Sequence, residues 1–253
     1  MDVSAPVAGN ATELILEQRS FRQAEVEETF KVLQSINNGL GQAVYNNNSR
    51  NEGKTLSSWQ NHLDLKHLVM GGHSFGATLA LQVLSDPSVP ANGGLTFDPG
   101  KSSGPLNSDF NQSVVIPDSE AWSAEPSEFY GKQHFEVVKS IAQSSLNKTG
   151  AGWFMTLLGT SHTSISDAPL LIGSLLSLFD PTSSNVTLGN AEANIQQYVN
   201  VSADFFEFLV NGSNSGVLAS GITTPEFEII NPNATNVAGI FDGWEVHVAP
   251  SAK

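Results

Sequence analysis

The pentapeptide GHSFG at residues 72–76 constrains the fold of this chain more than any other stretch. It follows a short apolar run at residues 68–70 and precedes a helical pattern over residues 77–84. A G-x-S-x-G sequence between a strand and a helix is typical of a sharp turn that lifts the serine above the end of a sheet. The sequence therefore predicts a strand, a tight turn centred on Ser74 and a helix.

The rest of the chain continues this order of strand and helix. Short apolar runs predict buried strands at residues 68–70, 94–97, 114–116 and 153–158, and helical periodicity is present over 12–36, 77–84, 134–146, 170–179 and 194–210. Such alternation favours an α/β fold with a mostly parallel sheet and helices on both faces. We expect one domain over residues 1–253, with an exposed loop at 37–58 and a weakly structured tail at 213–253.

Ser74 is the candidate nucleophile. Gly72 and Gly76 flank the turn, and we expect both to be needed for close approach of neighbouring elements, since neither carries a β-carbon. His73 completes the motif beside the serine. The positive end of the following helix favours a developing oxyanion, and the backbone N–H of Phe75 is the expected donor.

A serine hydroxyl needs a base, and the base needs an acid that fixes its tautomer. With this kind of turn the three groups follow in the order Ser, Asp, His. Asp98 comes directly after the predicted strand at 94–97, which would aim its carboxylate at the same sheet edge, so we predict Asp98 as the acid. Asp86, Asp109 and Asp118 remain alternatives, and Asp118 is the strongest because it follows the next strand.

The predicted base is His162, which lies in the loop directly after the apolar strand at 153–158. Loops at the carboxyl ends of strands are where an open α/β sheet assembles its site. The other histidines fit less well, because they precede the turn, adjoin the serine, open a helix or lie in the tail: His62, His67, His73, His134 and His247.

These residues resemble the plasma-type platelet-activating factor acetylhydrolases, lipoprotein-associated phospholipases that remove short or oxidised acyl chains. The resemblance lies in residues 72–76, 94–98, 114–122 with the Ser119-Glu120 pair, and 159–167, within a stretch from Glu13 to about Gly212. It implies the α/β-hydrolase fold, with Ser74, Asp98 and His162 as nucleophile, acid and base and Phe75 as an oxyanion donor. The many N-x-S/T triplets, which are acceptor sites for N-glycosylation, and the low basic content suggest a fungal-like secreted member.

The segment before the turn departs from the pattern of that family. Family members carry an earlier strand and a glycine-containing loop that donates a second hydrogen bond to the oxyanion. None of Gly9, Gly39, Gly41 or Gly53 follows a convincing strand. We therefore expect a chain truncated at its N-terminus, with reduced activity, because losing one oxyanion donor costs on the order of 10²–10³ in rate.

Composition limits the partners. With 25 acidic and 11 basic residues the net charge is −14, which repels nucleic acid and anionic membranes. No cysteine is present, so thiolate nucleophiles, disulfides and cysteine-ligated metals are excluded. We expect a small-molecule or lipid ester as substrate, no nucleic acid, no cofactor, no metal cluster and at most peripheral contact with lipid aggregates. The oligomeric state is not predicted.

Eight asparagines begin N-x-S/T triplets and favour a secreted, glycosylated protein: Asn10, Asn47, Asn111, Asn147, Asn185, Asn200, Asn211 and Asn233. Residues 1–10 carry no signal-peptide pattern, so secretion would require an upstream segment. The apolar run from Leu170 to Phe179 is shorter than a membrane span, and we expect it to pack as a helix rather than to dock on lipid.

The sequence thus predicts a serine esterase that acts through an acyl-enzyme on Ser74, with a short-acyl glycerophospholipid as the substrate that the resemblance implies. Two alternatives remain open. One is an esterase for another substrate class, such as a polyester or a small soluble ester. The other is a secreted glycoprotein that uses a catalytically impaired hydrolase fold for binding.

Overall fold

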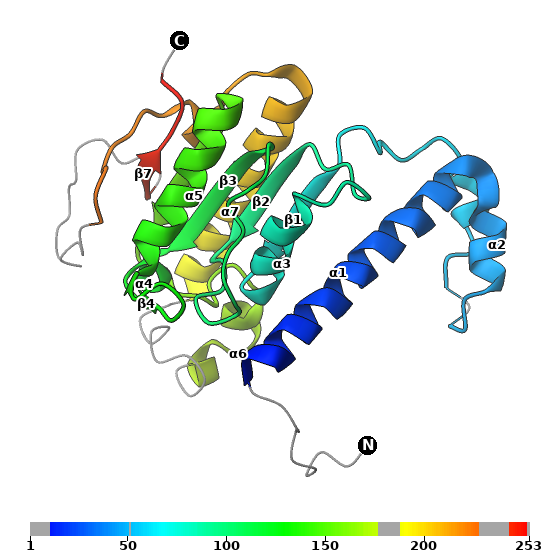
Figure 1. Cartoon of the computed structure of the whole chain (residues 1–253), viewed down its shortest axis with the longest axis horizontal. Helices are drawn as coiled ribbons and strands as arrows, with labels where there is room; N and C mark the ends of the chain where they lie inside the picture. Colours follow the sequence, from blue (N-terminus) through cyan, green and yellow to red (C-terminus); the bar gives the residue numbers. More distant parts are fainter. Residues whose placement is uncertain (1–10, 51, 177–187, 228–242, 252–253) are drawn as a thin grey trace. The chain divides into compact units, whose positions relative to one another are not determined.

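A five-stranded sheet forms the centre of the computed structural model, which describes residues 11–50, 52–176, 188–227 and 243–251 (Figure 1). Its strand order is β1 (Val69–His73), β2 (Gly93–Phe97), β3 (Ser113–Ser119), β6 (Gly152–Leu157) and β7 (Trp244–Val248). The first four run parallel, and β7 pairs antiparallel with β6. The expected mostly parallel sheet is confirmed.

Helices cover both faces of the sheet, as Figure 1 shows. On one face α3 (Phe75–Val83) and α5 (His134–Thr149) pack on Val114 and Ile116 of β3, and on the other α7 (Leu188–Asn211) packs on a cluster that includes Val115. Successive residues of β3 therefore belong to the two hydrophobic cores on opposite faces of the sheet. This double burial explains why the parallel strands read as unbroken apolar runs.

Shorter elements follow β3 and β6 along the chain. After β3 come α4 (Glu120–Ser123) and a small antiparallel ribbon of β4 (Pro126–Ser127) and β5 (Lys132–Gln133). After β6 comes α6 (Ala168–Leu176), where the sequence predicted a packed helix over 170–179. Leu171 and Ile172 of this helix are not packed as expected, because they are 73% and 41% exposed. Residues 177–179 of the predicted run lie outside the described part.

The chain divides into two compact units, Met1–Lys66 with Pro87–Val89, and His67–Asp86 with Pro90–Lys253. The second unit carries the whole sheet. That both belong to one domain over 1–253 stays a prediction.

The first unit corrects the loop expected at 37–58. Here α1 (Ala11–Ser35) runs into a π-helical turn, η1 (Ile36–Leu40), and then into α2 (Gly41–Asn46), and a 3₁₀ turn, η2, follows at Leu56–Ser58. Gly39, with φ of 91°, makes a kink where the asparagine- and glycine-rich sequence predicted an end. The backbone carbonyl and side-chain oxygen of Asn37 accept the backbone N–H groups of Asn61 and Leu63, both at 3.0 Å, which ties the kink to the chain that follows.

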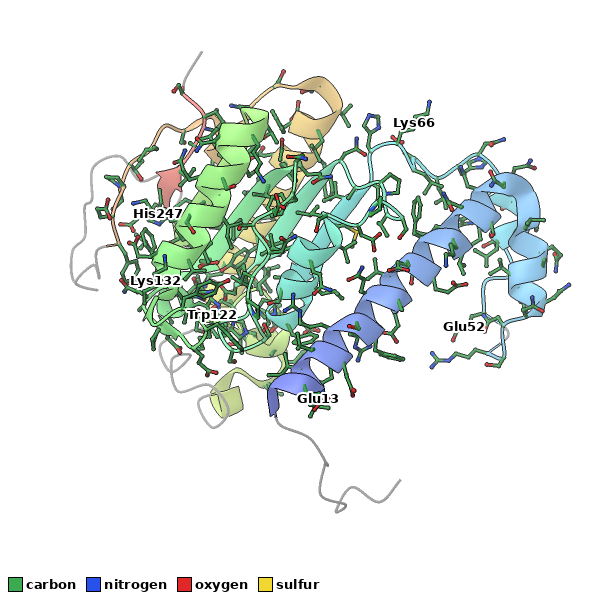
Figure 2. All side chains as sticks on the ribbon, viewed as in Figure 1. Glu13, Glu52, Lys66, Trp122, Lys132 and His247 are labelled. Atoms are coloured by element: carbon green, nitrogen blue, oxygen red, sulfur yellow. The ribbon has the colours of Figure 1, made fainter. Side chains whose placement is uncertain are left out.

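The tail expected to be weakly structured contains a buried strand, β7, and a 3₁₀ turn, η4 (Gly216–Ala219). In β7 the apolar residues alternate with Glu245 and His247, which are each only 1% exposed. Because polar residues interrupt the apolar ones, the sequence contains no apolar run that would predict this strand. His247, labelled in Figure 2, is hydrogen-bonded to Thr156 Oγ1 at 2.9 Å and to the Thr224 carbonyl oxygen at 2.5 Å.

Candidate active site

Ser74 sits on a strained turn between β1 and α3. Its backbone has φ of 58° and ψ of −120°, outside the regions that residues with a side chain favour. The turn is fixed on both sides, because the Ser74 N–H donates to the Phe97 carbonyl of β2 at 3.0 Å and the Ser74 carbonyl accepts the N–H of Ala77 at 3.1 Å. The serine is therefore held at the carboxyl end of β1 and the N-terminus of α3.

His162 lies in the loop after β6, and the chain after β3 anchors this loop. The Glu120 side chain accepts the Gly159 N–H at 2.6 Å, and the Ala121 N–H donates to the Thr160 carbonyl at 3.2 Å. Two segments far apart in the sequence are thus joined beside the imidazole. The sequence marked Ser119-Glu120 only through the family resemblance, and nothing in its spacing assigned this anchoring.

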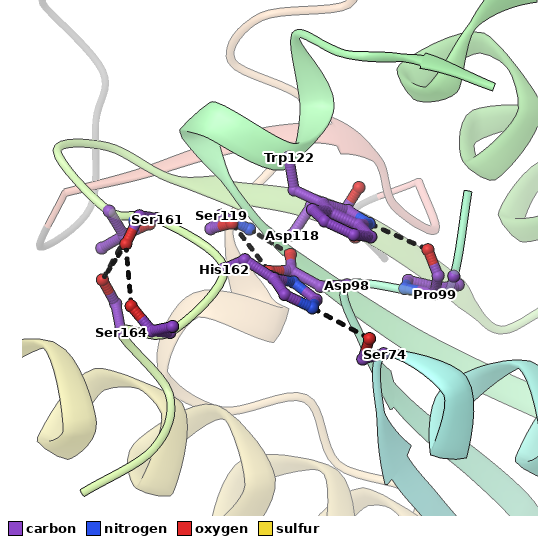
Figure 3. A network of polar contacts seen from close by, with 12 residues as sticks. Ser74, Asp98, Pro99, Asp118, Ser119, Trp122, Ser161, His162 and Ser164 are labelled. Carbon is purple, nitrogen blue, oxygen red and sulfur yellow. Dashed lines mark hydrogen bonds and ion pairs between the residues drawn. The ribbon is translucent and has the colours of Figure 1, made fainter. Parts of the chain in front are cut away.

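The structure brings the three predicted residues together at one edge of the sheet (Figure 3). His162 Nε2 lies 2.9 Å from Ser74 Oγ, and His162 Nδ1 lies 2.9 Å from Asp98 Oδ2. Ser74 follows β1, Asp98 follows β2, and His162 lies in the loop after β6. Because a carboxylate only accepts, Nδ1 carries the proton in this arrangement and Nε2 is left to accept from the serine hydroxyl.

A model of the family described as "Platelet-activating factor acetylhydrolase, isoform II" matches residues 4–211. The chain belongs to this family. Family membership implies a hydrolase that acts on esters. A search of curated proteins found no match to the chain. Among the described residues of this acetylhydrolase-family chain, no helix combines the length and apolarity that crossing a bilayer needs.

Asp98 is well placed to hold the imidazole of this acetylhydrolase-family chain. Its side chain is 4% exposed, and its backbone has φ of 46°. Besides His162, its carboxylate accepts the Ser119 backbone N–H at 2.6 Å and the Ser119 hydroxyl at 2.7 Å. The end of β3 therefore supplies two of the three hydrogen bonds that fix the acid.

The alternative acids lie in other surroundings. Asp118 is fully buried, and burial together with the neighbouring charge of Asp98 raises its pKa well above the usual range. Within the described chain its carboxyl group accepts one hydrogen bond, a long one from Ser123 Oγ at 3.4 Å. Asp109 is solvent-exposed and pairs with Lys148 at 3.1 Å, and Asp86 follows the far end of α3. The site of this family member thus contains one hydrogen-bonded carboxylate, Asp98, and one buried carboxyl group with a raised pKa, Asp118.

The other predicted site groups are placed as follows. Phe75 is the first residue of α3, where a backbone N–H has no acceptor within the helix and is available to an outside group. Its role as oxyanion donor stays a prediction. His73 lies against His162 with ring centroids 4.4 Å apart, and its pKa is lowered by burial and by His162. Residues 11–50 and 52–68 form no strand, so the described chain shows no glycine loop after an earlier strand.

Three residues of the site bring potential metal-ligating atoms close together. The fold gathers ligand atoms of His73, Asp98 and His162 within 4.8 Å of one another, although their spacing in the sequence showed no cluster. Both nitrogens of His162 are already hydrogen-bonded, one to Asp98 and one to Ser74. The geometry therefore fits a proton relay better than a metal site.

The two glycines of the motif are expected to differ sharply on substitution. A β-carbon on Gly72 would lie 2.3 Å from the carbonyl group of Gly76, whereas one on Gly76 would meet nothing within 4 Å. Close approach thus requires Gly72 only. We expect Gly72→Ala to lower the free energy of unfolding by about 3 kcal/mol and Gly76→Ala by less than about 1 kcal/mol, measured by denaturant titration. Equal losses in the two variants would contradict this account.

Because two histidines are buried, we expect the free energy of unfolding to fall in acid. Burial lowers the pKa of His134 and of His247 from 6.5 to about 4. Between these values the unfolded chain binds more protons than the folded one, so the free energy of unfolding falls as the pH drops from 6.5 towards 4. A shift of this size corresponds to on the order of 3 kcal/mol per histidine.

The check is denaturant unfolding at several pH values in that window. His247→Gln keeps a hydrogen-bonding side chain that does not titrate, so its stability should depend less steeply on pH than that of the wild type. An unchanged slope would show that His247 is not responsible.

Proposed function

We propose that this chain is a serine esterase that removes short or oxidised acyl chains from glycerophospholipids through an acyl-enzyme on Ser74. The observation that carries the proposal is the continuous pair of 2.9 Å contacts from Ser74 through His162 to Asp98. Membership of the acetylhydrolase family supports the choice of a lipid ester as substrate.

The reaction follows from the roles of the three side chains. Ser74 Oγ attacks the ester carbonyl while His162 Nε2 takes its proton, and Asp98 stabilises the imidazolium. The protonated His162 then gives the proton to the leaving alcohol. Water attacks the acyl-enzyme with His162 again as the base, which releases the carboxylic acid and restores Ser74. The N–H of Phe75, at the N-terminus of α3, stabilises the oxyanion in both steps.

The substrate class is tested by comparing hydrolysis of a short-acyl phosphatidylcholine with hydrolysis of nitrophenyl esters of increasing chain length. We expect the phospholipid with a short acyl group at its middle position to have the highest kcat/KM. A preference for soluble nitrophenyl esters or polyester films would instead assign the site to another class of ester. A folded protein that neither turns over any ester nor reacts with a fluorophosphonate probe would favour the binding glycoprotein.

We also propose that the protein is secreted and glycosylated. The sequon asparagines within the described chain are all exposed: Asn47, Asn111, Asn147, Asn200 and Asn211. Expression of the chain behind a secretion signal in a eukaryotic host should give a product whose electrophoretic mobility increases after treatment with an N-glycosidase. Replacing these five asparagines by glutamine should remove most of that shift. A secreted product with no shift would contradict the glycoprotein assignment.

A further inference from the structure

The imidazole of His162 is in contact with two other rings. Trp122 of α4 stacks on it with ring centroids 3.7 Å apart and planes only 9° from parallel, and His73 lies against it at 4.4 Å. Figure 3 shows the indole beside the imidazole, with the indole bonded to Pro99 and the imidazole bonded to Ser74. The ring plane of the proposed base is thus set by contacts with its faces as well as by hydrogen bonds at its edge.

Trp122 is itself fixed from the loop that follows the proposed acid. Its indole N–H donates to the Pro99 carbonyl at 2.8 Å, and Pro99 is the residue next to Asp98. The ammonium group of Lys101 lies 4.2 Å from the centre of the Trp122 ring and forms an ion pair with Glu125. The indole therefore connects the loop after β2, which carries the acid, to the ring of the base.

The geometry of this stack suits a charged imidazole. Two neutral aromatic rings prefer offset or edge-to-face packing with centroids 4.5–7 Å apart, whereas a cation is attracted to the face of an aromatic ring, and most strongly to that of tryptophan. In the proposed reaction His162 gains a positive charge when it takes the proton of Ser74. The stacking therefore gains strength as the reaction approaches its transition state, which is the condition for an interaction to raise kcat.

We propose that Trp122 is a positioning residue that holds the His162 ring in line with Ser74 and Asp98 and stabilises its protonated form. This inference rests on the proposed function. Trp122→Phe keeps a ring face at this position, and Trp122→Met fills the space without a ring. Trp59, an exposed tryptophan of the first unit, provides the matched control variant Trp59→Met.

The test measures kcat and KM of purified full-length variants on a short-acyl phosphatidylcholine, together with the rate of fluorophosphonate labelling. We expect Trp122→Met to lower kcat about tenfold with KM nearly unchanged, Trp122→Phe to fall between it and the wild type, and Trp59→Met to match the wild type. The downfield proton resonance of the His162–Asp98 hydrogen bond should broaden in Trp122→Met and persist in Trp122→Phe.

Each other outcome overturns the inference. A rise in KM at constant kcat would make Trp122 a substrate contact, and equal losses in Trp122→Phe and Trp122→Met would assign the effect to the lost bond to Pro99. Should Trp122→Met fail to fold, a Trp122→Phe variant with the kcat of the wild type would exclude a role for the indole in charge stabilisation. A wild-type protein that the probe does not label would instead refute the proposed function, so the two failures are distinguishable.

Discussion

Replacing Ser74 with alanine is expected to lower kcat by on the order of 10⁶, because in the proposed mechanism its hydroxyl forms the acyl-enzyme. His162→Ala should cost about as much. The double variant should be no worse than either single one, since nucleophile and base act as a unit. Steady-state hydrolysis of a nitrophenyl ester and fluorophosphonate labelling both measure the effect.

The matched control is Ser85→Ala. Ser85 lies just beyond the other end of α3 and accepts a hydrogen bond from the Asn107 side chain, so its loss leaves the turn untouched. This variant should keep the wild-type kcat. Labelling that survives in Ser74→Ala would place the nucleophile elsewhere in the chain.

Asparagine substitutions at the two neighbouring aspartates are expected to give opposite results. Asp98→Asn should lower kcat by on the order of 10⁴, because an amide can donate to Nδ1 and so stabilise the wrong tautomer of His162. Asp118→Asn should change kcat by less than about threefold, since burial raises the pKa of this carboxyl group and so favours its neutral form, and an amide has nearly the same shape.

A stability measurement separates the two aspartates independently of activity. Because the pKa of Asp118 is raised in the folded state, the unfolded chain gives up this proton at a lower pH than the folded one. The wild-type protein therefore loses stability relative to Asp118→Asn as the pH rises above the unfolded value of about 4. Thermal unfolding should show the two proteins diverging towards neutral pH. A constant difference at all pH values would mean that Asp118 is not held protonated.

The sequence predicted the parts of the site that depend on local order. Ser74, Asp98 and His162 each follow an apolar strand, and parallel strands bring their carboxyl ends to one edge, so position along the chain was enough to propose them. The stack of Trp122 on His162 arises only when segments 40 residues apart are folded together, and no periodicity encodes it.

The errors have equally local causes. The strand β7 was missed because Glu245 and His247 alternate with its apolar residues, although both are buried, and His247 is hydrogen-bonded to Thr156 and Thr224. The helix α2 was missed because Gly39 marks a kink as clearly as it marks an end. Polar residues and glycines indicate exposed loops on average. In β7 the polar residues are buried in a strand, and before α2 the glycine lies at a kink between two helices.

The strand order has a consequence for the length of the chain after β6. Two strands, β2 and β3, separate β1 from β6, so Ser74 and the start of the histidine loop stand about 14 Å apart across the sheet. The five steps from Leu157 to His162 span at most about 17 Å when fully extended. Removing two residues from this tether would shorten its reach by about 7 Å. We expect such a deletion to draw the imidazole away from the serine while the sheet stays intact.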